Sequence, residues 1–232
     1  MKLSINILNW NTMKTFHETF HILKVECLGK SAEVIVVDNG STDGCENFAT
    51  IRNPVNLGIS KAKNQGIDAS KGDYIMLIDG DIVPVRNSIC MLERYLDDNP
   101  ECMAIGFYPN KFSRTLDSAE TFCTKLDPID VYHGHCIYYG MYRKEVFQKC
   151  RFDEAFGPGY GWEDLDFYKQ MERAEIKQWV AGMNRYEGKY YHAINSSLNR
   201  NCLGDVEYHL SSIARKKLFD SKWVKNVSTV VA

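Results

Sequence analysis

The sequence lacks several features that would each indicate a particular class of protein. No stretch of about 18 consecutive apolar residues occurs, so it offers no candidate for a membrane-spanning helix. The formal net charge is only −2 and the pI is about 6.3. A protein without an overall basic field can contact nucleic acid only through a local patch.

The cysteines lack the spacing that metal and redox sites require. The chain has eight of them, but no two form a C-x-x-C pair, which excludes a zinc knuckle and a thioredoxin-type motif. Scattered single cysteines are typical of buried, reduced thiols. The first residues also lack the long apolar core of a signal peptide. We therefore expect a cytoplasmic protein.

What the N-terminal half does contain is an alternation of β-prone and helical segments. We expect strands over residues 3–8, 33–37 and 74–78, and helices over 13–28 and 59–69. Strands that alternate with helices through short connections predict an α/β, Rossmann-like domain with a mainly parallel central sheet flanked by helices.

The C-terminal half is less regular, but its pattern continues without a linker or a repeat. A Gly-rich loop over residues 153–160 leads into an acidic helix start. The other expected elements are helices over 89–97, 163–174 and 205–219, strands over 103–107 and 136–139, and two short strands within 176–192. We therefore predict one domain over residues 1–232.

Polar residues end each of the three N-terminal strands. Asn9 and Asp38 end the first two, and Asp79-Gly80-Asp81 ends the third. Ligands of parallel α/β sheets bind beyond the carboxyl ends of the strands. Two carboxylates separated by one glycine can reach a single Mg²⁺ or Mn²⁺ ion, with phosphate oxygens as further ligands. Taken alone, such a pair is as often only a solvated strand end.

A second cluster follows the Gly-rich loop. Tyr160 and Trp162 lead into Glu163, Asp164 and Asp166. Acidic residues in the first turn of a helix commonly serve only as caps and partners of the helix dipole. Aromatic faces can also stack on a sugar or a base, and a carboxylate beside them can deprotonate a hydroxyl group.

Histidines and a basic segment complete the set of candidates. His192 is either a structural side chain or a metal ligand, and His133 and His135 form a weaker metal or acceptor candidate. Residues 211–232 are rich in Lys and Arg. Such a segment is most often a solvated helix face, with phosphate or nucleic-acid contact as the alternative.

Taken together and in this order, these motifs resemble those of the family 2 glycosyltransferases of the GT-A fold. Leu8 stands where many members have proline, and the residues after His192 lack the usual glycines. The segments that carry the resemblance are 5–11, 34–43, 53–66, 72–81 and 162–164, followed by His192.

The resemblance implies an inverting, metal-dependent transfer of a sugar from a nucleotide-diphosphate donor to an acceptor hydroxyl. Mn²⁺ or Mg²⁺ is the implied cofactor. Residues 1–100 would form the nucleotide-sugar half, and residues 101–232 the acceptor half with the C-terminal tail. Asp164 would be the general base, and Trp162, Glu163, Asp166 and Tyr160 would bind the acceptor. The donor would be bound by Asn9, Asn11, Asp38, Asn56, Lys61, Asp79 and Gly80, and the metal by Asp81, His192 and Asp79.

The acceptor stays open at this point. A saccharide is the first expectation, and a hydroxymethylated pyrimidine in phage DNA is the alternative. A nucleotidyltransferase would share the architecture, but residues 8–15 lack its Gly-rich, basic pyrophosphate loop. A catalytically inactive sugar-binding module is weakly motivated, because every carboxylate that the reaction would need is present.

Overall fold

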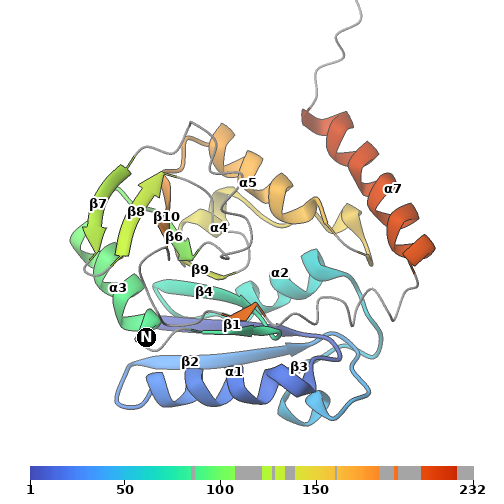
Figure 1. The fold of residues 1–232 in the computed structure, drawn as a ribbon, viewed down its shortest axis with the longest axis horizontal. Coiled ribbons are helices and arrows are strands. Elements are labelled where there is room, and N and C mark those ends of the chain that lie inside the picture. The colour runs from blue at the N-terminus through green and yellow to red at the C-terminus, as the bar shows by residue number, and fades with distance from the viewer. Residues whose placement is uncertain are drawn as a thin grey trace, which may run out of the picture.

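A computed structural model describes residues 1–84, 87–107, 122–126, 129–133, 139–159, 161–182, 191–192 and 205–223 of the chain. Its centre is a nine-stranded mixed sheet (Figure 1). The strand order is β3-β2-β1-β4-β9-β6-β10-β8-β7. The predicted α/β class with a central sheet and flanking helices is therefore confirmed.

The first four strands run parallel and align their polar ends. They are β1 (Leu3–Asn9), β2 (Ala32–Asp38), β3 (Ile51–Arg52) and β4 (Tyr74–Asp79). The apolar runs of β1, β2 and β4 are buried on both faces, as expected for the centre of a parallel sheet. In the register of the sheet, Asn9 lies opposite Asp38, and Leu8 lies opposite Asp79. The polar strand ends therefore meet at one edge.

The other five strands extend the same sheet. Strand β9 (Tyr139–Arg143) is antiparallel to β4 and to β6 (Ala104–Phe107), and β10 (Gln178–Gly182) is parallel to β6. Strands β6 and β10 thus run in the direction of the first four. The antiparallel pair β7 (Phe122–Leu126) and β8 (Ile129–His133) follows at the edge.

One expected strand is shifted. We expected it over residues 136–139, whereas the described strand β9 begins at Tyr139. Residues 136–138 lie outside the described part of the chain.

Helices cover both faces of the sheet. Figure 1 shows α1 (Met13–Glu26) and α2 (Ile59–Ala69) on opposite sides of it. The core on the α1 side also takes in α3 (Ser88–Asp98), through side chains such as Leu92. The core on the other side takes in α4 (Val146–Lys149) and α5 (Glu163–Arg173).

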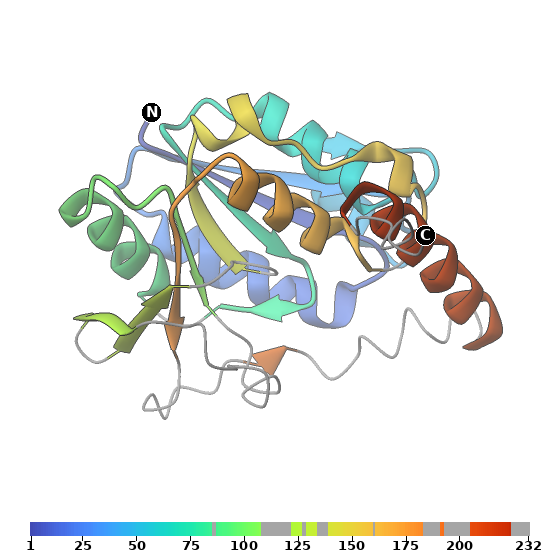
Figure 2. The ribbon, with the colours of Figure 1, turned by 90° about the horizontal axis from the view of Figure 1, so that it is seen from above.

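The remaining elements lie around the edge where the polar strand ends meet. Strand β5 (Ile82–Val83) follows β4 and pairs with β11 (Tyr191–His192). Helix α7 (Asp205–Trp223) packs beside the start of α5, as the view from above shows (Figure 2). Two 3-10 helices, η1 (Cys45–Phe48) and η3 (Glu154–Phe156), complete the list of elements. Within the described ranges, no helix is long and apolar enough to cross a membrane.

Candidate active site

The ends of β1 and β2 are joined by a buried polar network. Asn9 donates a hydrogen bond to Asp38 and another to Ser41, each 3.2 Å long. The backbone N–H of Asn11 donates to Ser41 over 2.9 Å, and the Asn11 side chain accepts from Thr42 over 2.9 Å. The side chains of Asn9 and Asp38 are fully buried. In this structure these two side chains fix the loops around the predicted nucleoside pocket.

The loop before α2 is shaped in a similar way by Asn56. Its side-chain oxygen accepts hydrogen bonds from the Asn39 amide and from the Gly58 backbone, both over 2.9 Å. Lys61, in the first turn of α2, is half exposed, and its closest carboxylate partner is Glu154 at 3.9 Å. Lys61 is therefore a surface cation that is available to a ligand but is not fixed by the fold.

Gly80 connects this network to the predicted metal strand. A Cβ atom at Gly80 would lie 2.9 Å from the side-chain oxygen of Asn9 and 2.8 Å from the hydroxyl of Thr12. Glycine is required there because the backbone passes so close to these polar groups. The Asp79-Gly80-Asp81 turn therefore lies directly against the strand-end network.

Asp79 has a buried carboxylate oxygen that a hard cation could satisfy. Its Oδ1 atom has no hydrogen-bond partner within the part of the chain that the structure describes, and the Lys63 ammonium lies 3.8 Å from it. Burial raises the pKa of Asp79 to about 7, and the nearby Asp81 and Asp164 charges add to the increase. An unsatisfied carboxylate oxygen beside a second carboxylate fits a hard cation such as Mg²⁺ or Mn²⁺.

The backbone brings His192 to the same place. Strand β11 pairs antiparallel with β5, and His192 lies opposite Ile82, the residue that follows Asp81. The described residues alone do not form a group of three or more metal-binding side chains. His192 is nevertheless a neighbour of Asp79 and Asp81 in the fold, although more than a hundred residues separate it from them in sequence.

The acceptor-side cluster is divided by the periodicity of α5. Glu163 and Asp166 are buried on the face that packs against the core, whereas the side chain of Asp164 is 17% exposed. Asp166 accepts hydrogen bonds from Gln170 over 2.8 Å and from the Trp223 ring over 2.7 Å. Asp164 is therefore the carboxylate of this turn that stands at the rim of the site.

Lys63 joins the two halves of the site. Its ammonium is 5% exposed and lies 2.8 Å from Asp164 and 3.8 Å from Asp79. Burial alone lowers the pKa of Lys63, but the two carboxylates outweigh burial and raise it above its usual value. Lys63 stays charged, and its ammonium lies between Asp164, the predicted base, and Asp79 on the predicted metal strand.

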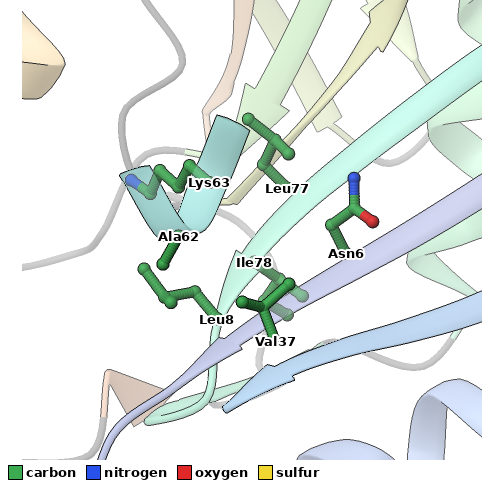
Figure 3. Close-up of a pocket in the computed structure, with 7 residues that line it drawn as sticks. All are labelled: Asn6, Leu8, Val37, Ala62, Lys63, Leu77 and Ile78. Atoms are coloured by element: carbon green, nitrogen blue, oxygen red, sulfur yellow. The ribbon is translucent and has the colours of Figure 1, made fainter. Parts of the chain in front are cut away.

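A small cavity lies beneath α2, next to the stem of Lys63. It lies between α2 and strands β1, β2 and β4, and the side chains around it are mostly apolar. Figure 3 shows the Lys63 ammonium pointing away from Leu8, Val37 and Ile78. The cavity therefore lies under the aliphatic stem of Lys63, and the charged end faces the carboxylates.

The sequence interpretation missed Lys63 and favoured Lys61. The signal was present in the helical periodicity, because Ser60, Lys63, Asn64 and Ile67 form the buried stripe of α2. A lysine on that stripe must find a carboxylate partner, since an unpaired buried ammonium is costly. Lys61 lies on the opposite, solvated face.

The expectation of a solvated or nucleic-acid-binding basic segment is wrong for Arg215. Its guanidinium is 5% exposed and donates to Glu163 over 3.2 Å. It also donates to the carbonyl of Gly161 over 3.2 Å and to that of Gly157. A cation buried against α5 cannot contact DNA phosphates. Lys216 and Lys217, the next two residues, are exposed.

Burial is the main cause of the pKa shifts of Glu163 and Arg215. It raises the pKa of Glu163 to about 7, with the adjacent Asp164 charge as the second cause. Burial also lowers the pKa of Arg215 below its usual value. Each partner thus pays a desolvation cost that their mutual attraction only partly offsets.

Two candidates cannot be placed. Tyr160 and His135 lie outside the described residues. His133 lies on β8 and pairs with Trp179 of β10, and three strands (β9, β6 and β10) separate β8 from β4, the strand that Asp79 ends. The structure does not bring His133 to the Asp79-Gly80-Asp81 turn.

This arrangement of strand-end carboxylates and loops has relatives among known proteins. The profile of glycosyl transferase family 2 matches residues 4–151, which is more than half of the chain. The chain belongs to glycosyl transferase family 2. The matched range contains the strand-end network, Lys63 and the Asp79-Gly80-Asp81 turn, and it ends before α5.

Two curated relatives of this family 2 chain are bacterial glycosyltransferases. Glycosyltransferase GlyG of Streptococcus pneumoniae is 33% identical over an alignment of 120 residues, and the match covers 47% of this chain and 39% of GlyG. Abequosyltransferase RfbV of Salmonella typhimurium is 25% identical over 190 residues, 67% of this chain and 57% of RfbV. In these matches, this chain therefore spans 39% and 57% of the two relatives.

Solved structures share the fold. Mannosyltransferase PcManGT of Pyrobaculum calidifontis, in complex with GDP-Man and Mn²⁺, matches with a TM-score of 0.61 at 16% identity, covering 92% of this chain and 64% of that one. Residues 1–349 of Staphylococcus aureus TarS, in complex with UDP-GlcNAc, match with a TM-score of 0.55 at 17% identity, covering 80% and 57%.

The central position of Lys63 predicts a large effect of its removal. Lys63→Met leaves Asp79 and Asp164 facing each other without the cation, and we expect a loss of roughly 3 kcal/mol in the free energy of unfolding. Lys61→Met, on the exposed face of the same helix, should change it by less than about 0.5 kcal/mol. Urea denaturation of both variants checks this. Equal effects would contradict the assigned role of Lys63.

The raised pKa of Glu163 predicts a pH dependence of stability. Because this pKa is about 7 in the folded chain against an ordinary 4.5, the unfolded chain loses its proton first as the pH rises. The contribution is therefore complete below about pH 4.5 and is lost towards pH 7. Urea denaturation at several pH values, without divalent metal, should show stability falling across this window.

The matched variants separate Glu163 from other carboxyls. Glu163→Gln should flatten part of the fall, whereas Glu172→Gln, on the exposed side of α5, should leave it unchanged. Because the pKa of Asp79 is also raised, the stability of Glu163→Gln should still fall with pH, though less steeply than that of the wild type. An unaltered slope in Glu163→Gln would show that Glu163 is ionised in the folded chain at neutral pH.

Proposed function

We propose that this chain is a metal-dependent, inverting glycosyltransferase that moves a sugar from a nucleotide-diphosphate donor to an acceptor hydroxyl, most simply on a saccharide. The observation that carries the proposal is the meeting of Asp79 and Asp164 around Lys63 at the carboxyl edge of the parallel strands, with the charge of Asp81 beside Asp79. Family membership supports the sugar transfer, and neighbours of the same fold bind GDP-Man and UDP-GlcNAc.

The donor would lie over the ends of β1, β2 and β4. Asn9 and Asp38 hold the loops there, and Asn11, Asn56 and Lys61 stand nearer the surface as contacts for nucleoside and phosphate. Gly80 lets the backbone of the Asp79-Gly80-Asp81 turn pack against Asn9, which joins the turn to these loops.

Asp81, His192 and Asp79 would hold Mn²⁺ or Mg²⁺, which supplies positive charge beside the diphosphate leaving group. The buried Oδ1 of Asp79 and its raised pKa support this assignment, because a bound cation would satisfy the oxygen and favour the ionised carboxylate. A solved neighbour of the same fold is a complex with Mn²⁺.

Asp164 would act as the general base. The acceptor oxygen attacks the anomeric carbon, the bond from that carbon to the diphosphate oxygen breaks, and the hydroxyl proton passes to the Asp164 carboxylate. Lys63 holds the Asp164 carboxylate in place through its 2.8 Å ion pair. Attack from the side opposite the leaving group inverts the anomeric configuration.

On the acceptor side, Trp162 and Asp164 keep partly exposed side chains, whereas Glu163 and Asp166 are buried and support them. A saccharide suits this arrangement, because an aromatic ring can stack on a sugar face beside the base. The alternative acceptor, a modified pyrimidine of DNA, gains no support from Arg215, which is buried.

The base assignment predicts a separation of binding from transfer. A thermal-shift screen of nucleotide-sugars with Mn²⁺ first identifies the donor. With that donor, Asp164→Asn should retain donor affinity and lose transfer by roughly 10²–10⁴-fold, because it cannot accept the proton. Calorimetry measures donor binding, and release of nucleoside diphosphate measures turnover. Asp98→Asn, at an exposed end of α3, is the control. Near-wild-type turnover in Asp164→Asn would remove it as the base.

The metal assignment predicts reversible inactivation by a chelator. EDTA should abolish release of nucleoside diphosphate, and excess Mn²⁺ or Mg²⁺ should restore it. Asp81→Asn should weaken Mn²⁺ binding, measured directly by calorimetry without donor, by about tenfold or more. Turnover that persists in EDTA would contradict the metal role while leaving the assignment of Asp164 untouched.

A further inference from the structure

Helix α7 lies beyond the matched family range and packs on the acceptor side of the site. Its contacting residues are Arg215, Phe219, Lys222 and Trp223, a spacing that places them on one face of a helix. The partners of this face are Asp153, Gly157, the residues 161–162 and the first turn of α5. The last of these carries Asp164.

The loop that α7 contacts has an unusual backbone. Gly157, Gly159, Gly161 and Trp162 all have positive φ angles, and φ is 77° at Trp162. A bulky residue in this left-handed region costs on the order of 1 kcal/mol or more, and persists only where its surroundings hold it. The Trp162 ring packs against Phe219 with 5.2 Å between ring centroids, and Lys216 lies over it.

Arg215 holds both ends of this loop at once. One guanidinium donates to the carbonyl of Gly157 at its start, to that of Gly161 near its end, and to Glu163 in the first turn of α5. A planar, multidentate donor is suited to fixing three acceptors in one geometry. Glu163 is adjacent to Asp164, so the same contact also sets the backbone that carries the proposed base.

The Gly157 carbonyl is also the meeting point with the donor side. A Cβ atom at Gly58 would lie 2.4 Å from this carbonyl oxygen, so the two loops touch through backbone alone. Gly58 begins α2, the helix that carries Lys63. The carbonyl that Arg215 binds is therefore in contact with the loop that leads to the cation at the centre of the site.

We propose that Arg215 is a positioning residue, through which α7 fixes Gly157 and Gly161 on the acceptor side and the orientation of Asp164. The inference rests on the proposed function, since it assigns acceptor-side geometry to a helix that the family match does not include. The hydrogen bonds of Asn9 with Asp38 and Ser41, and the pairing of β1 with β4, do not involve Arg215. Donor binding should therefore survive while transfer suffers.

The test compares Arg215→Met and Arg215→Lys with the control Lys217→Met, an exposed residue on the same helix. Hydrogen–deuterium exchange should rise about tenfold in residues 157–166 of Arg215→Met and stay unchanged in β1 and β4. Arg215→Lys should lie between this variant and the wild type, since one ammonium cannot bind all three acceptors. Lys217→Met should match the wild type. Should Arg215→Met fail to fold, Phe219→Leu gives the same readout.

Kinetics provide the second arm. With the donor identified for the wild type, kcat for nucleoside diphosphate release should fall about tenfold or more in Arg215→Met, with KM for the donor within about twofold. Loop exchange that stays at the wild-type level, or that rises equally throughout the sheet, would overturn the positioning role. So would an unchanged kcat.

A failure of the proposed function is distinguishable from a failure of this inference. If the wild type released no nucleoside diphosphate from any donor, the transferase proposal would fall. The exchange pattern of residues 157–166 would still decide whether α7 fixes the loop.

Discussion

The candidate site depends on one buried cation. Lys63 lies between Asp79 at the end of β4 and Asp164 at the start of α5, two residues that come from different halves of the sequence. A buried ammonium is tolerable only if carboxylates surround it, and two such carboxylates repel each other unless a cation separates them. Lys63 therefore needs both carboxylates, and both carboxylates need Lys63. This requirement fixes the distance between Asp79 on the proposed donor side and Asp164 on the proposed acceptor side.

The surrounding fold supplies this requirement through packing. The aromatic ring of Phe152 lies 5.1 Å from the Lys63 ammonium and stacks on Phe167 of α5 at 4.3 Å. The stem of Lys63 passes over the apolar contacts between α2 and the sheet. Movement of α5 away from the sheet would therefore break the apolar core and the ion pair together. The packing of α5 in the core thus helps to hold Asp164 in position.

Much of this was predictable from the sequence where local pattern and chemistry agree. Continuous β-branched runs that end in Asn9, Asp38 and Asp79 predicted a parallel sheet with a polar edge, and the register places those ends together. The prediction failed where a residue's role depends on a partner far away in sequence. Nothing local distinguishes Lys63 from Lys61 except the helical stripe, and nothing local in α7 indicates that Arg215 pairs with Glu163.

The same reasoning explains why the second half was harder to interpret. Its strands join a sheet whose centre is already formed, so β9 enters antiparallel between β4 and β6, which a strand–helix alternation does not predict. Helix α5 is clear from its periodicity, but the division between buried Glu163 and the rim residue Asp164 depends on where the sheet lies. Tertiary packing decides such cases.

Charge balance around Lys63 links the fold to the proposed chemistry. Among the described residues of this region, the acidic side chains Asp79, Asp81, Glu163 and Asp164 outnumber the buried cations Lys63 and Arg215. Burial raises the pKa values of Asp79 and Glu163 to about 7, and the neighbouring carboxylate charges add to the increase. A divalent cation beside Asp79 and Asp81 would offset this negative charge and favour the ionised form of Asp79. In the proposed mechanism the metal ion therefore balances the charge of the site, and Asp164 takes the proton of the acceptor.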